Sequence, residues 1–469
     1  MSKSPSSGDR FARLTRALAL STLGLASSAP AVAASYSLEE AVDHALENNP
    51  RLGSSEAAIR EAEEELTAAR SAGGPRVDLS FSGKASNNPM DAFGDKLQAG
   101  NIEADFNKQP PDLGDFDPDT LNDPDPSTLL TGEVNVSYPV YTGGRLEAGV
   151  RGAQSARQAA SRGHLRAREV VAYQTYRAYL GVQAAERGLR IAEEAVATAE
   201  EHVATTRELV RQGRIVESDR LTAEVNLAEM RAGEMEARRD LRRARNRLRL
   251  AMGLDNGDSV EVEPLPDAAE HEADLAELPE LQRQALEGRY DLRSLRAQLA
   301  AQRAAVDGQR AEHGPTVNLV ATGNSYGESE FSDNTSWRVM GVINYRLYDG
   351  GVVSSRTAAA RQRVAAVQAE IRSRQQAIRN EVQSAHDDIQ VARMQLDSTR
   401  GTVEQARRNV ALVDDRYGQG RTILIDLLQA EGGLVKARQE ALGANIALHN
   451  GLADLALAQG RVLELFDQE

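Results

Sequence analysis

Two long stretches of the chain carry apolar residues at alternating spacings of three and four positions. The first pattern runs over 171–210 and the second over 378–417, each for more than five heptads. This is the a/d pattern of a coiled coil, and it predicts a long α-helix in each stretch. Many of these positions hold Ala or Thr, whose small side chains let helix axes approach closely. A second apolar stripe, which includes Tyr173 and Leu180, lies beside the first, so we expect each helix to pack against two neighbours.

Each long helix is predicted to be the first arm of a helical hairpin. The first helix spans 145–212 without a proline, which corresponds to a length of about 100 Å. Gly213 and Gly420 follow the two helices, and glycine is the usual residue where a helix ends in a left-handed conformation. A second proline-free arm follows each glycine, so hairpins are expected over 145–251 and 352–460. A solvated bundle or stalk remains an alternative from this pattern alone.

Four other segments alternate apolar and polar residues with a period of two, which predicts β-strands with one apolar face. They lie at about 76–86, 131–141, 316–325 and 336–348. Strands of about ten residues are long enough to cross a membrane, whereas no segment after residue 34 has the roughly 18 apolar residues of a membrane helix. Four strands cannot close on themselves, and open strand edges cannot face lipid. A membrane-spanning form would therefore require several copies of the chain.

The same order of predicted elements occurs twice, which indicates duplication of a unit far longer than a solenoid repeat. Eleven residues of the first copy recur 207 positions later: Tyr138, Tyr141, Gly143, Gly144, Gly213, Arg214, Asp219, Leu221, Ala223, Glu224 and Gly253. Eight residues of an earlier segment, 45–79, recur at an offset of 240, and the difference between the offsets places 33 additional residues in the first copy. They fall within 87–130, which holds six of the fifteen prolines of the chain. We expect this segment to be a solvated loop rather than an element of the fold.

These patterns divide the chain into four segments. Residues 1–34 have basic residues before an apolar run and end in Ala31-Val32-Ala33-Ala34, which is typical of a secretory signal peptide. The first structural repeat is expected over 35–253 and the second over 281–469. The segment 254–280, which is rich in proline and acidic residues, is expected to link them. The predicted fold class is mainly α with a small β part.

Composition and charge exclude several classes of function. The formal net charge of −15 argues against nucleic acid as a partner. The chain has no cysteine, so disulfides, thiolate metal sites and lipid attachment at an amino-terminal cysteine are excluded. Its seven histidines are scattered, without an HExxH motif or a paired metal spacing. We therefore expect no cofactor, no metal site and no enzymatic activity.

The corners between predicted strands and helices carry a pair of related motifs. Tyr141-Thr142-Gly143-Gly144 and Tyr348-Asp349-Gly350-Gly351 share the form aromatic-x-Gly-Gly. Together with the turn segments 213–224 and 420–431 and an acidic loop that begins at Asn88, they resemble the TolC-type outer-membrane efflux family. The resemblance covers nearly all of the chain after the predicted signal peptide. A single motif of this kind is weak, whereas the duplicated set in the same order is specific.

The resemblance implies a homotrimer. Its twelve strands would form one outer-membrane β-barrel in contact with lipid, and its helices an α-barrel that extends into the periplasm and closes at the inner tip. Such proteins are passive exit ducts of tripartite efflux pumps or type I secretion, and they work with a periplasmic adaptor and an inner-membrane transporter. The rival interpretation is a periplasmic adaptor or another coiled-coil structural protein, such as an adhesin-like stalk. An adaptor would have one hairpin flanked by β-rich halves, whereas two hairpins are predicted in this chain.

The resemblance also places a gate at the helical tips. Asp426 matches a gate aspartate of the family, and Asp219 is its counterpart in the first hairpin. Gln429 stands where the family pattern has a second aspartate, and the arginine that ties the closed tip together would fall at Thr422. A ring of carboxylates in a narrow pore would attract cations. The alternative is that both aspartates cap the second helix of their hairpin.

A docking surface for the adaptor is implied at the same tips. It would include Gly213, Arg214, Gly420 and Arg421. Both glycines also have a structural explanation, as helix terminators. Both arginines could instead neutralise the carboxy-terminal dipole of the preceding helix.

Overall fold

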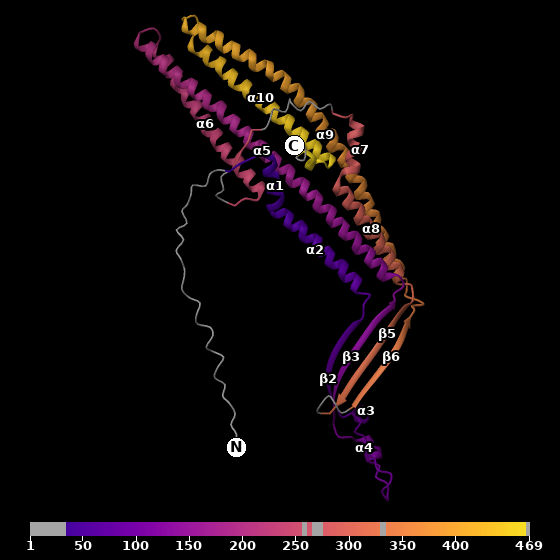
Figure 1. Ribbon diagram of the computed structural model, residues 1–469. Helices are drawn as coiled ribbons and strands as arrows, with labels where there is room; N and C mark the ends of the chain where they lie inside the picture. The colour runs from indigo at the N-terminus through magenta and orange to yellow at the C-terminus, as the bar shows by residue number, and fades with distance from the viewer. Residues whose placement is uncertain (1–33, 256–259, 265–274, 329–333, 466–469) are drawn as a thin grey trace, which may run out of the picture.

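The computed structural model describes residues 34–255, 260–264, 275–328 and 334–465. The predicted signal peptide therefore lies outside the described residues, apart from Ala34. The described chain is elongated, with long helices at one end and a β-sheet at the other (Figure 1).

Each half of the chain contains the same succession of elements. In the first half these are α1 (Leu38–Asn48), α2 (Pro50–Ser71), β2 (Arg76–Ser86), β3 (Ser127–Tyr141), α5 (Arg145–Arg211) and α6 (Glu217–Met252). In the second half they are α7 (Leu278–Gly288), α8 (Tyr290–Ala311), β5 (Thr316–Gly327), β6 (Asn334–Asn344), α9 (Val352–Gly418) and α10 (Leu424–Gln459). Corresponding helices have equal lengths of 11, 22, 67 and 36 residues. The two long hairpins and the four strands predicted from the periodicity are confirmed.

Glycines mark the ends of the long helices α5 and α9. Gly144 and Gly351 are the N-cap residues, with φ of 88° and 87°, and Gly213 and Gly420 follow the C-caps with φ of 67° and 72°. Glycine adopts positive φ without the steric cost that other residues incur. These four positions therefore determine where the two helices begin and end.

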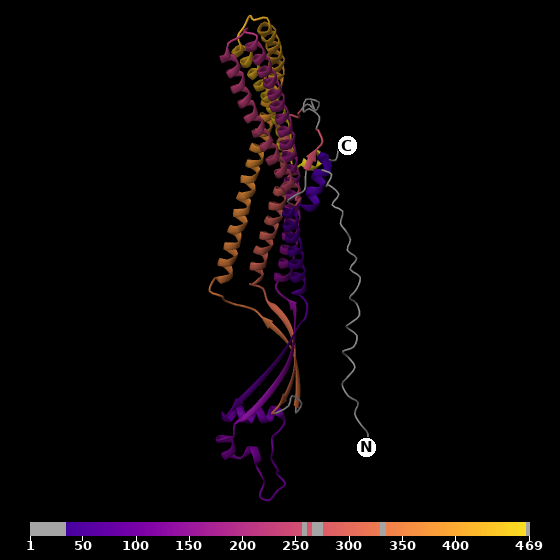
Figure 2. The ribbon, with the colours of Figure 1, turned by 90° about the vertical axis from the view of Figure 1, so that its left-hand side faces the viewer.

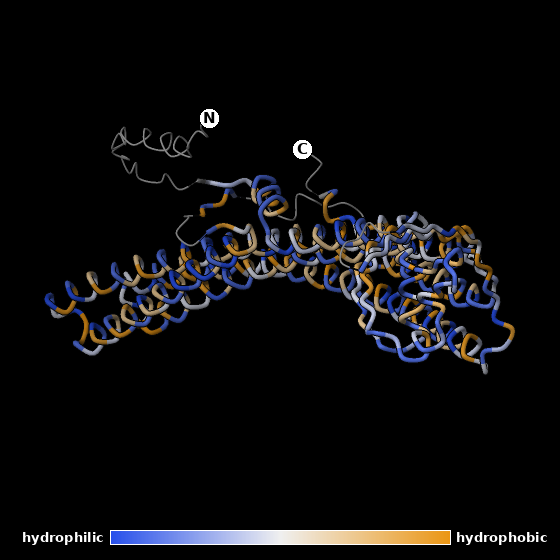
Figure 3. The backbone as a smooth tube through the Cα atoms, turned by 90° about the horizontal axis from the view of Figure 1, so that it is seen from below, coloured by the Kyte–Doolittle hydropathy of each residue, from blue (hydrophilic) through white to orange (hydrophobic). Residues whose placement is uncertain are grey.

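The predicted heptad seams form the packed core of the hairpins. In α5 the buried seam residues are Val171, Thr175, Val182, Val196, Ala199, Val203 and Thr206. In α9 they are Ile378, Val382, Ala385, Ile389, Ala392 and Leu396. Hydrophobic and hydrophilic residues accordingly alternate along the long helices (Figure 3).

Within the described part of the chain, no helix combines the length and the apolar character that crossing a membrane requires.

The four long strands form one antiparallel sheet in the order β2–β3–β5–β6. Its centre is the pairing of β3 with β5, which joins the two halves of the chain and runs from Leu130 opposite Gly327 to Tyr141 opposite Val317. The register shifts next to Pro139, because proline has no N–H to donate to the ladder.

Two strand ends differ from the predictions by four residues, because the pairing partner sets the length of a strand. β3 begins at Ser127, four residues before the predicted start, because β2 extends to Ser86 opposite it. β6 ends at Asn344 rather than at 348, because its partner β5 begins at Thr316, opposite Asn344. The apolar alternation continues past Asn344, but a strand requires a neighbour to bond.

The prediction of a solvated loop over 87–130 was wrong in part. This segment contains the helix α3 (Pro89–Ala99), the 3-10 helix η1 (Gly114–Phe116), the short helix α4 (Pro118–Asn122) and the start of β3. Pro89 and Pro118 occupy first helical positions, where proline is favoured rather than disruptive. The carboxylate of Asp95 on α3 lies 2.6 Å from Lys84 on β2 and accepts a bond from Ser127, so the segment packs onto the sheet. It lies at the end of the sheet away from the long helices (Figure 2).

A second, two-stranded sheet was not predicted. β1 (Ala34–Tyr36) pairs in parallel with β4 (Val260–Val262), which lies in the segment expected to be a linker. The hydroxyl of Tyr179 on α5 donates to the carbonyls of Tyr36 (3.0 Å) and Glu263 (2.8 Å), which holds both strands against the long helix. Strands of three residues are too short to show a period-two pattern.

Candidate functional site at the helical tips

Both helical tips are built from the same hydrogen-bonded turn. The backbone N–H groups of Gly213 and Arg214 each donate, at 2.9 Å, to carbonyls of the last turn of α5. Gly420 and Arg421 make the corresponding bonds to α9, at 2.9 and 2.8 Å. These bonds satisfy carbonyls that the helix end leaves open, so the structural explanation of the two glycines is confirmed. The side chains of Arg214 and Arg421 are exposed, and their role in docking stays a prediction.

Asp219 and Asp426 occupy the third positions of α6 and α10. The N-cap residues of these helices are Val216 and Ile423, and neither helix has a side-chain cap hydrogen bond. The alternative that the two aspartates cap the helices is therefore wrong. Their carboxylates still lie in the first turn, where a negative charge complements the helix dipole.

The predicted gate residues divide between the two tips. Asp426 and Gln429 are both exposed and lie three residues apart on α10, so they share one face of the helix. Thr422 stands where the family pattern has an arginine, and its hydroxyl donates to the Asp426 carboxylate. Asp219 lies on the other tip and is partly buried. The role of these residues as a gate stays a prediction.

Tyr417, in the last turn of α9, joins the two tips. It is partly buried against Val203, Ala223 and Leu424, which come from α5, α6 and α10. Burial, with a smaller contribution from the charge of Asp219, raises the pKa of the Tyr417 phenol. Its hydroxyl is buried and has no hydrogen-bond partner among the described residues. The sequence marked Tyr417 only as a seam position, although an aromatic ring among small seam residues was a usable signal.

An ion pair also joins the two hairpins near the tips. The Nε2 atom of His202 on α5 lies 2.5 Å from the carboxylate of Glu431 on α10, and the two side chains are only 12% and 19% exposed. The hydrogen bond to Glu431 raises the pKa of His202, against the opposing effect of burial, and the charges of Asp414 and Glu201 act in the same direction as Glu431. The sequence does not reveal this contact, because its partners lie 229 positions apart and no local pattern links them.

The tips differ in the chemistry of their second helices. At the start of α6, Arg220 donates to Glu217 at 2.8 Å and also contacts Glu224. The corresponding positions of α10 hold Leu424 and Leu427 in place of Glu217 and Arg220, and both leucines are buried. The first tip therefore presents ion pairs to solvent, whereas the second tip packs apolar side chains inward.

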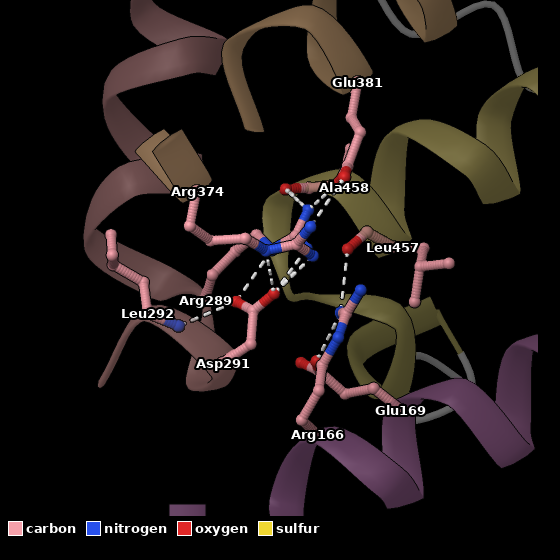
Figure 4. A network of polar contacts seen from close by, with 9 residues as sticks. All are labelled: Arg166, Glu169, Arg289, Asp291, Leu292, Arg374, Glu381, Leu457 and Ala458. Atoms are coloured by element: carbon pink, nitrogen blue, oxygen red, sulfur yellow. Dashed lines mark hydrogen bonds and ion pairs between the residues drawn. The ribbon is translucent and has the colours of Figure 1, made fainter. Parts of the chain in front are cut away.

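A buried polar network lies away from the tips, where α8 begins (Figure 4). The guanidinium of Arg289 is fully buried and donates to the two oxygens of Asp291, at 3.1 and 2.7 Å. It also contacts Glu381 on α9 and donates to the carbonyl of Ala458 on α10 at 3.4 Å. Arg374 on α9 donates to Asp291 at 2.8 Å. The network ties α8, α9 and α10 together.

The pKa values of the acidic residues in this network depend on the balance between burial and the neighbouring guanidinium groups. Burial would raise the pKa of Asp291, but the guanidinium groups of Arg289 and Arg374 outweigh it and hold that pKa well below its ordinary value. For Glu169 on α5, burial dominates and raises the pKa, although Arg166 lies 2.8 Å away. Arg166 also donates to a carbonyl of α10, so α5 joins the same junction. The arrangement is that of a structural junction between helices.

Within the ranges that the structure describes, no group of three or more His, Asp or Glu side chains is placed to hold a metal ion.

Comparisons with known proteins agree with this architecture. A family profile described as "Outer membrane efflux protein" matches residues 41–254 and 281–461. The structure of the Campylobacter jejuni CmeC outer membrane channel is similar, with 19% sequence identity and a TM-score of 0.75 over 91% of this chain and 86% of that one. A membrane protein from Pseudomonas aeruginosa has 20% identity and a TM-score of 0.75 over 90% and 92% of the two chains. The open state of the Neisseria gonorrhoeae MtrE outer membrane channel has 20% identity and a TM-score of 0.72 over 91% and 89%.

A comparison with curated protein sequences gave no match.

The family profile covers both halves of the chain and most of its length, and the solved structures share its fold. The resemblance inferred from the corner and tip motifs is therefore confirmed. The family is described as one of outer membrane efflux proteins, and the similar CmeC and MtrE structures are those of outer membrane channels. The chain accordingly belongs to the outer membrane efflux protein family and is a protein of the outer membrane.

Proposed function

We propose that three copies of the chain form a passive duct, through which small molecules or polypeptides delivered by an inner-membrane pump cross the periplasm and the outer membrane. The observation that carries this proposal is the pair of open edges of the four-stranded sheet. β2 and β6 are its outer strands, and neither pairs with a further strand among the described residues. Open edges cannot face lipid, so an edge of one copy requires an edge of another. Three copies would close twelve strands into one continuous sheet.

The exposed faces of the edge strands support the same assembly. On β2, Val77, Leu79 and Phe81 are 63–65% exposed, and on β6 Trp337 is 82% exposed. A surface that faces lipid requires outward apolar side chains of this kind at alternate positions. The four strands are 11 to 15 residues long, which is sufficient to cross a membrane.

The helical layer of a single chain is also incomplete at its edges. Near the tips α5 and α10 contact each other, which leaves α6 and α9 on the outside. α6 exposes Val225 and Met235, and α9 exposes Met394 and Leu412. In a ring of copies, α6 of one chain would pack against α9 of the next, which would remove this apolar surface from water.

The gate of the proposed duct would lie at the tips of the hairpins. Asp219, Asp426 and Gln429 would face the constriction, where three copies place their carboxylates around one axis. Carboxylates held close together in a narrow pore attract cations and slow the passage of anions. Because the chain belongs to a family of outer membrane efflux proteins, the alternative of a periplasmic adaptor or coiled-coil structural protein is not favoured.

The periplasmic adaptor would dock on the outer surface of the same tips, and the inner-membrane transporter would supply the energy. The docking residues would be Gly213, Arg214, Gly420 and Arg421. The two arginines are exposed next to turns whose backbone is hydrogen-bonded, so each chain presents a pair of positive charges to solvent. Such charges suit carboxylates on a partner protein.

Native mass spectrometry and planar-bilayer recordings test the assembly together. The purified protein is expected to be a trimer and to form ion-conducting pores. A monomer in mild detergent that forms no pores would contradict the proposal.

The gate is tested by the variant Asp426→Ala in the same recordings. Loss of three carboxylates from the constriction should change the single-channel conductance and weaken block by divalent cations. Asp397→Ala provides a matched control, because Asp397 is an exposed aspartate on α9 that lies several turns from the tip. If the unsubstituted protein and both variants show equal conductance and equal block, Asp426 is not part of the gate.

A further inference from the structure

A cleft of about 470 Å³ lies between α5, α9 and α10, away from the tips and from the buried junction. One turn or more of each helix contributes, so the cleft is complete in a single chain and does not depend on the proposed trimer. This volume is within the range of about 300–1,000 Å³ that small-molecule sites occupy. In Figure 1 the three helices run side by side through this region.

The cleft is strongly basic in a chain that is acidic as a whole. Its walls carry five arginines and a single acidic residue: Arg187, Arg190, Arg400, Arg407, Arg438 and Glu194. The formal charge of the whole chain is −15, so this concentration of positive charge is opposite in sign to the average surface. A concave site lined by one sign of charge raises the local concentration of ions of the other sign.

The positive charge of the cleft is only partly neutralised within the chain. Glu194 is the one acidic side chain of the lining, and it forms an ion pair with Arg438 at 2.6 Å. Arg407 lies 3.9 Å from Glu404, and both side chains are largely exposed. Arg190 and Arg400 form no ion pair with a residue that the structure describes. Two guanidinium groups on opposite walls are therefore available to a ligand, each with a forked set of donors that suits carboxylates and sulfonates.

Apolar side chains complete the lining. Ile191, Leu396, Val403 and Leu442 contribute from the same three helices. A purely inorganic anion would leave this apolar surface in contact with water. A ligand with an apolar body and one acidic group would contact both kinds of side chain at once.

The internal duplication shows that the fold itself does not require these arginines. At the positions 207 residues away, Glu193 corresponds to Arg400, Glu200 to Arg407, and Asp397 to Arg190. The corresponding positions thus carry carboxylates: Glu193 and Glu200 on α5, where Glu200 lies 2.7 Å from Arg231, and Asp397 on α9. Both copies fold into helices of the same length, although these positions hold opposite charges in the two copies. Helix formation therefore does not explain the arginines of the cleft.

We propose that this cleft is a binding site for amphipathic organic anions, such as carboxylates or sulfonates that carry an apolar ring or chain. The acidic group lies between Arg190 on α5 and Arg400 on α9. The apolar body lies against Leu396 and Leu442. The cleft is formed by one chain and contains none of the proposed gate residues, so binding there does not depend on the proposed gate.

Isothermal titration calorimetry with naphthalene-2-sulfonate tests the proposal on the full-length protein in lipid nanodiscs. Saturable binding is expected at one site per chain, and it should weaken as salt is added, because salt screens exposed charges. The neutral naphthalene-2-sulfonamide has the same ring and should bind at least about tenfold more weakly. Absence of saturable binding, or equal binding of the two compounds, would overturn the proposal.

Paired substitutions locate the site. The double variant Arg190→Ala, Arg400→Ala should weaken binding of the sulfonate by on the order of tenfold or more. The control is Arg242→Ala, Arg247→Ala, which removes the same charge from exposed positions of α6 and should leave the affinity within about twofold. Equal weakening by both pairs would show that overall charge attracts the anion, and it would overturn the assignment of the cleft.

The single variant Arg400→Glu tests whether a loss of binding comes from misfolding or from the changed charge. It installs the residue that the other copy has at the corresponding position, Glu193, so the helix tolerates it. Circular dichroism should show unchanged helix content, while binding of the sulfonate is lost. Unchanged binding in a folded Arg400→Glu protein would exclude this site.

Discussion

The two hairpins of the chain have the same lengths and the same end caps, yet their second helices lie in different surroundings. α10 buries fourteen of its 36 residues, whereas α6 buries four of 36. α10 lies between α9 and α5, while α6 packs mainly on α5. Position in the helical layer thus determines how apolar a helix is, even when its origin and its length are shared.

A similar contrast exists where the short helices join. Asn49 is the N-cap of α2, and its side-chain amide donates to the carbonyl of Ala251 at 2.8 Å. At the corresponding place in the second half, Arg289 is the N-cap of α8 and donates to the carbonyl of Ala458. A short amide and a long guanidinium thus reach equivalent carbonyls, 207 positions apart. Only the second brings a buried charge, and with it the network around Asp291.

The largest difference between the two halves should be in stability, when the side chains of Arg289 and Asn49 are each removed. Arg289→Ala removes a fully buried guanidinium and leaves the partly buried carboxylate of Asp291 with one partner fewer, and it should lower the free energy of unfolding by on the order of 4 kcal/mol. Asn49→Ala removes a neutral cap and should cost about 1 kcal/mol. Denaturant titration followed by circular dichroism measures both. Equal losses would show that the charge network adds nothing to the neutral cap.

The stabilities of the two variants, Arg289→Ala and Asn49→Ala, should also differ in their dependence on pH. The folded-state pKa of Asp291 is lowered, so its contribution to stability is present at neutral pH and is lost only as the pH falls through that lowered value. The side chain of Asn49 bonds to backbone groups of Arg51 and Ala251, which do not titrate, so the difference between the two variants should shrink in strong acid.

A smaller effect should separate the two tips. Leu427 is fully buried at the start of α10, and Leu427→Ala should lower the local free energy of opening by about 3 kcal/mol. Its counterpart on α6 is Arg220, whose ion pairs lie at the surface, so Arg220→Ala should have little effect. Hydrogen exchange of the amides near each substitution reports this local opening. Similar exchange in the two variants would contradict the proposed difference between the tips.

The smallest effect should come from the contact between the hairpins, and it should depend on pH. The folded-state pKa of His202 is raised, so its stabilising contact with Glu431 is fully present below the ordinary histidine pKa and is lost as the pH rises through the raised value. His202→Asn should therefore cost about 2 kcal/mol at a pH of about 5.5 and less at a pH of about 8. The thermal midpoint of unfolding, measured at both pH values, tests this.

Asn409 provides the control for this contact, because it holds the position that corresponds to His202 in the second hairpin and is exposed. Asn409→Ala should give the same small effect at both pH values. A cost of His202→Asn that did not change with pH would mean that the contact does not depend on the charge of the imidazole.

The elements with strong local signals were predictable from the sequence. The spacing of small apolar residues predicted α5 and α9, and Gly213 and Gly420 predicted where they end. β1 and β4 were missed because three residues carry no period. The helices of the 87–130 segment were missed because its prolines were interpreted as loop residues, whereas Pro89 starts a helix.

The candidate site was predictable to a lesser extent. The exposed positions of Asp426 and Gln429 on one face follow from their spacing on a helix. The contacts of Tyr417, His202 and Glu431 do not, because they join residues of different hairpins. No local pattern records which surface of one hairpin meets the other.

The sequence by itself determined the duplicated order of helices and strands, the ends of the long helices and the family to which the chain belongs. These properties depend on residues that lie close together along the chain, where spacing and backbone preference act directly. Only the tertiary structure decided which charges become partners. Arg289 meets Glu381 across 92 positions and Ala458 across 169, and the arginines of the cleft come from three helices. Electrostatic contacts depend on distance in space, and distance in space is set by the packing of the helices.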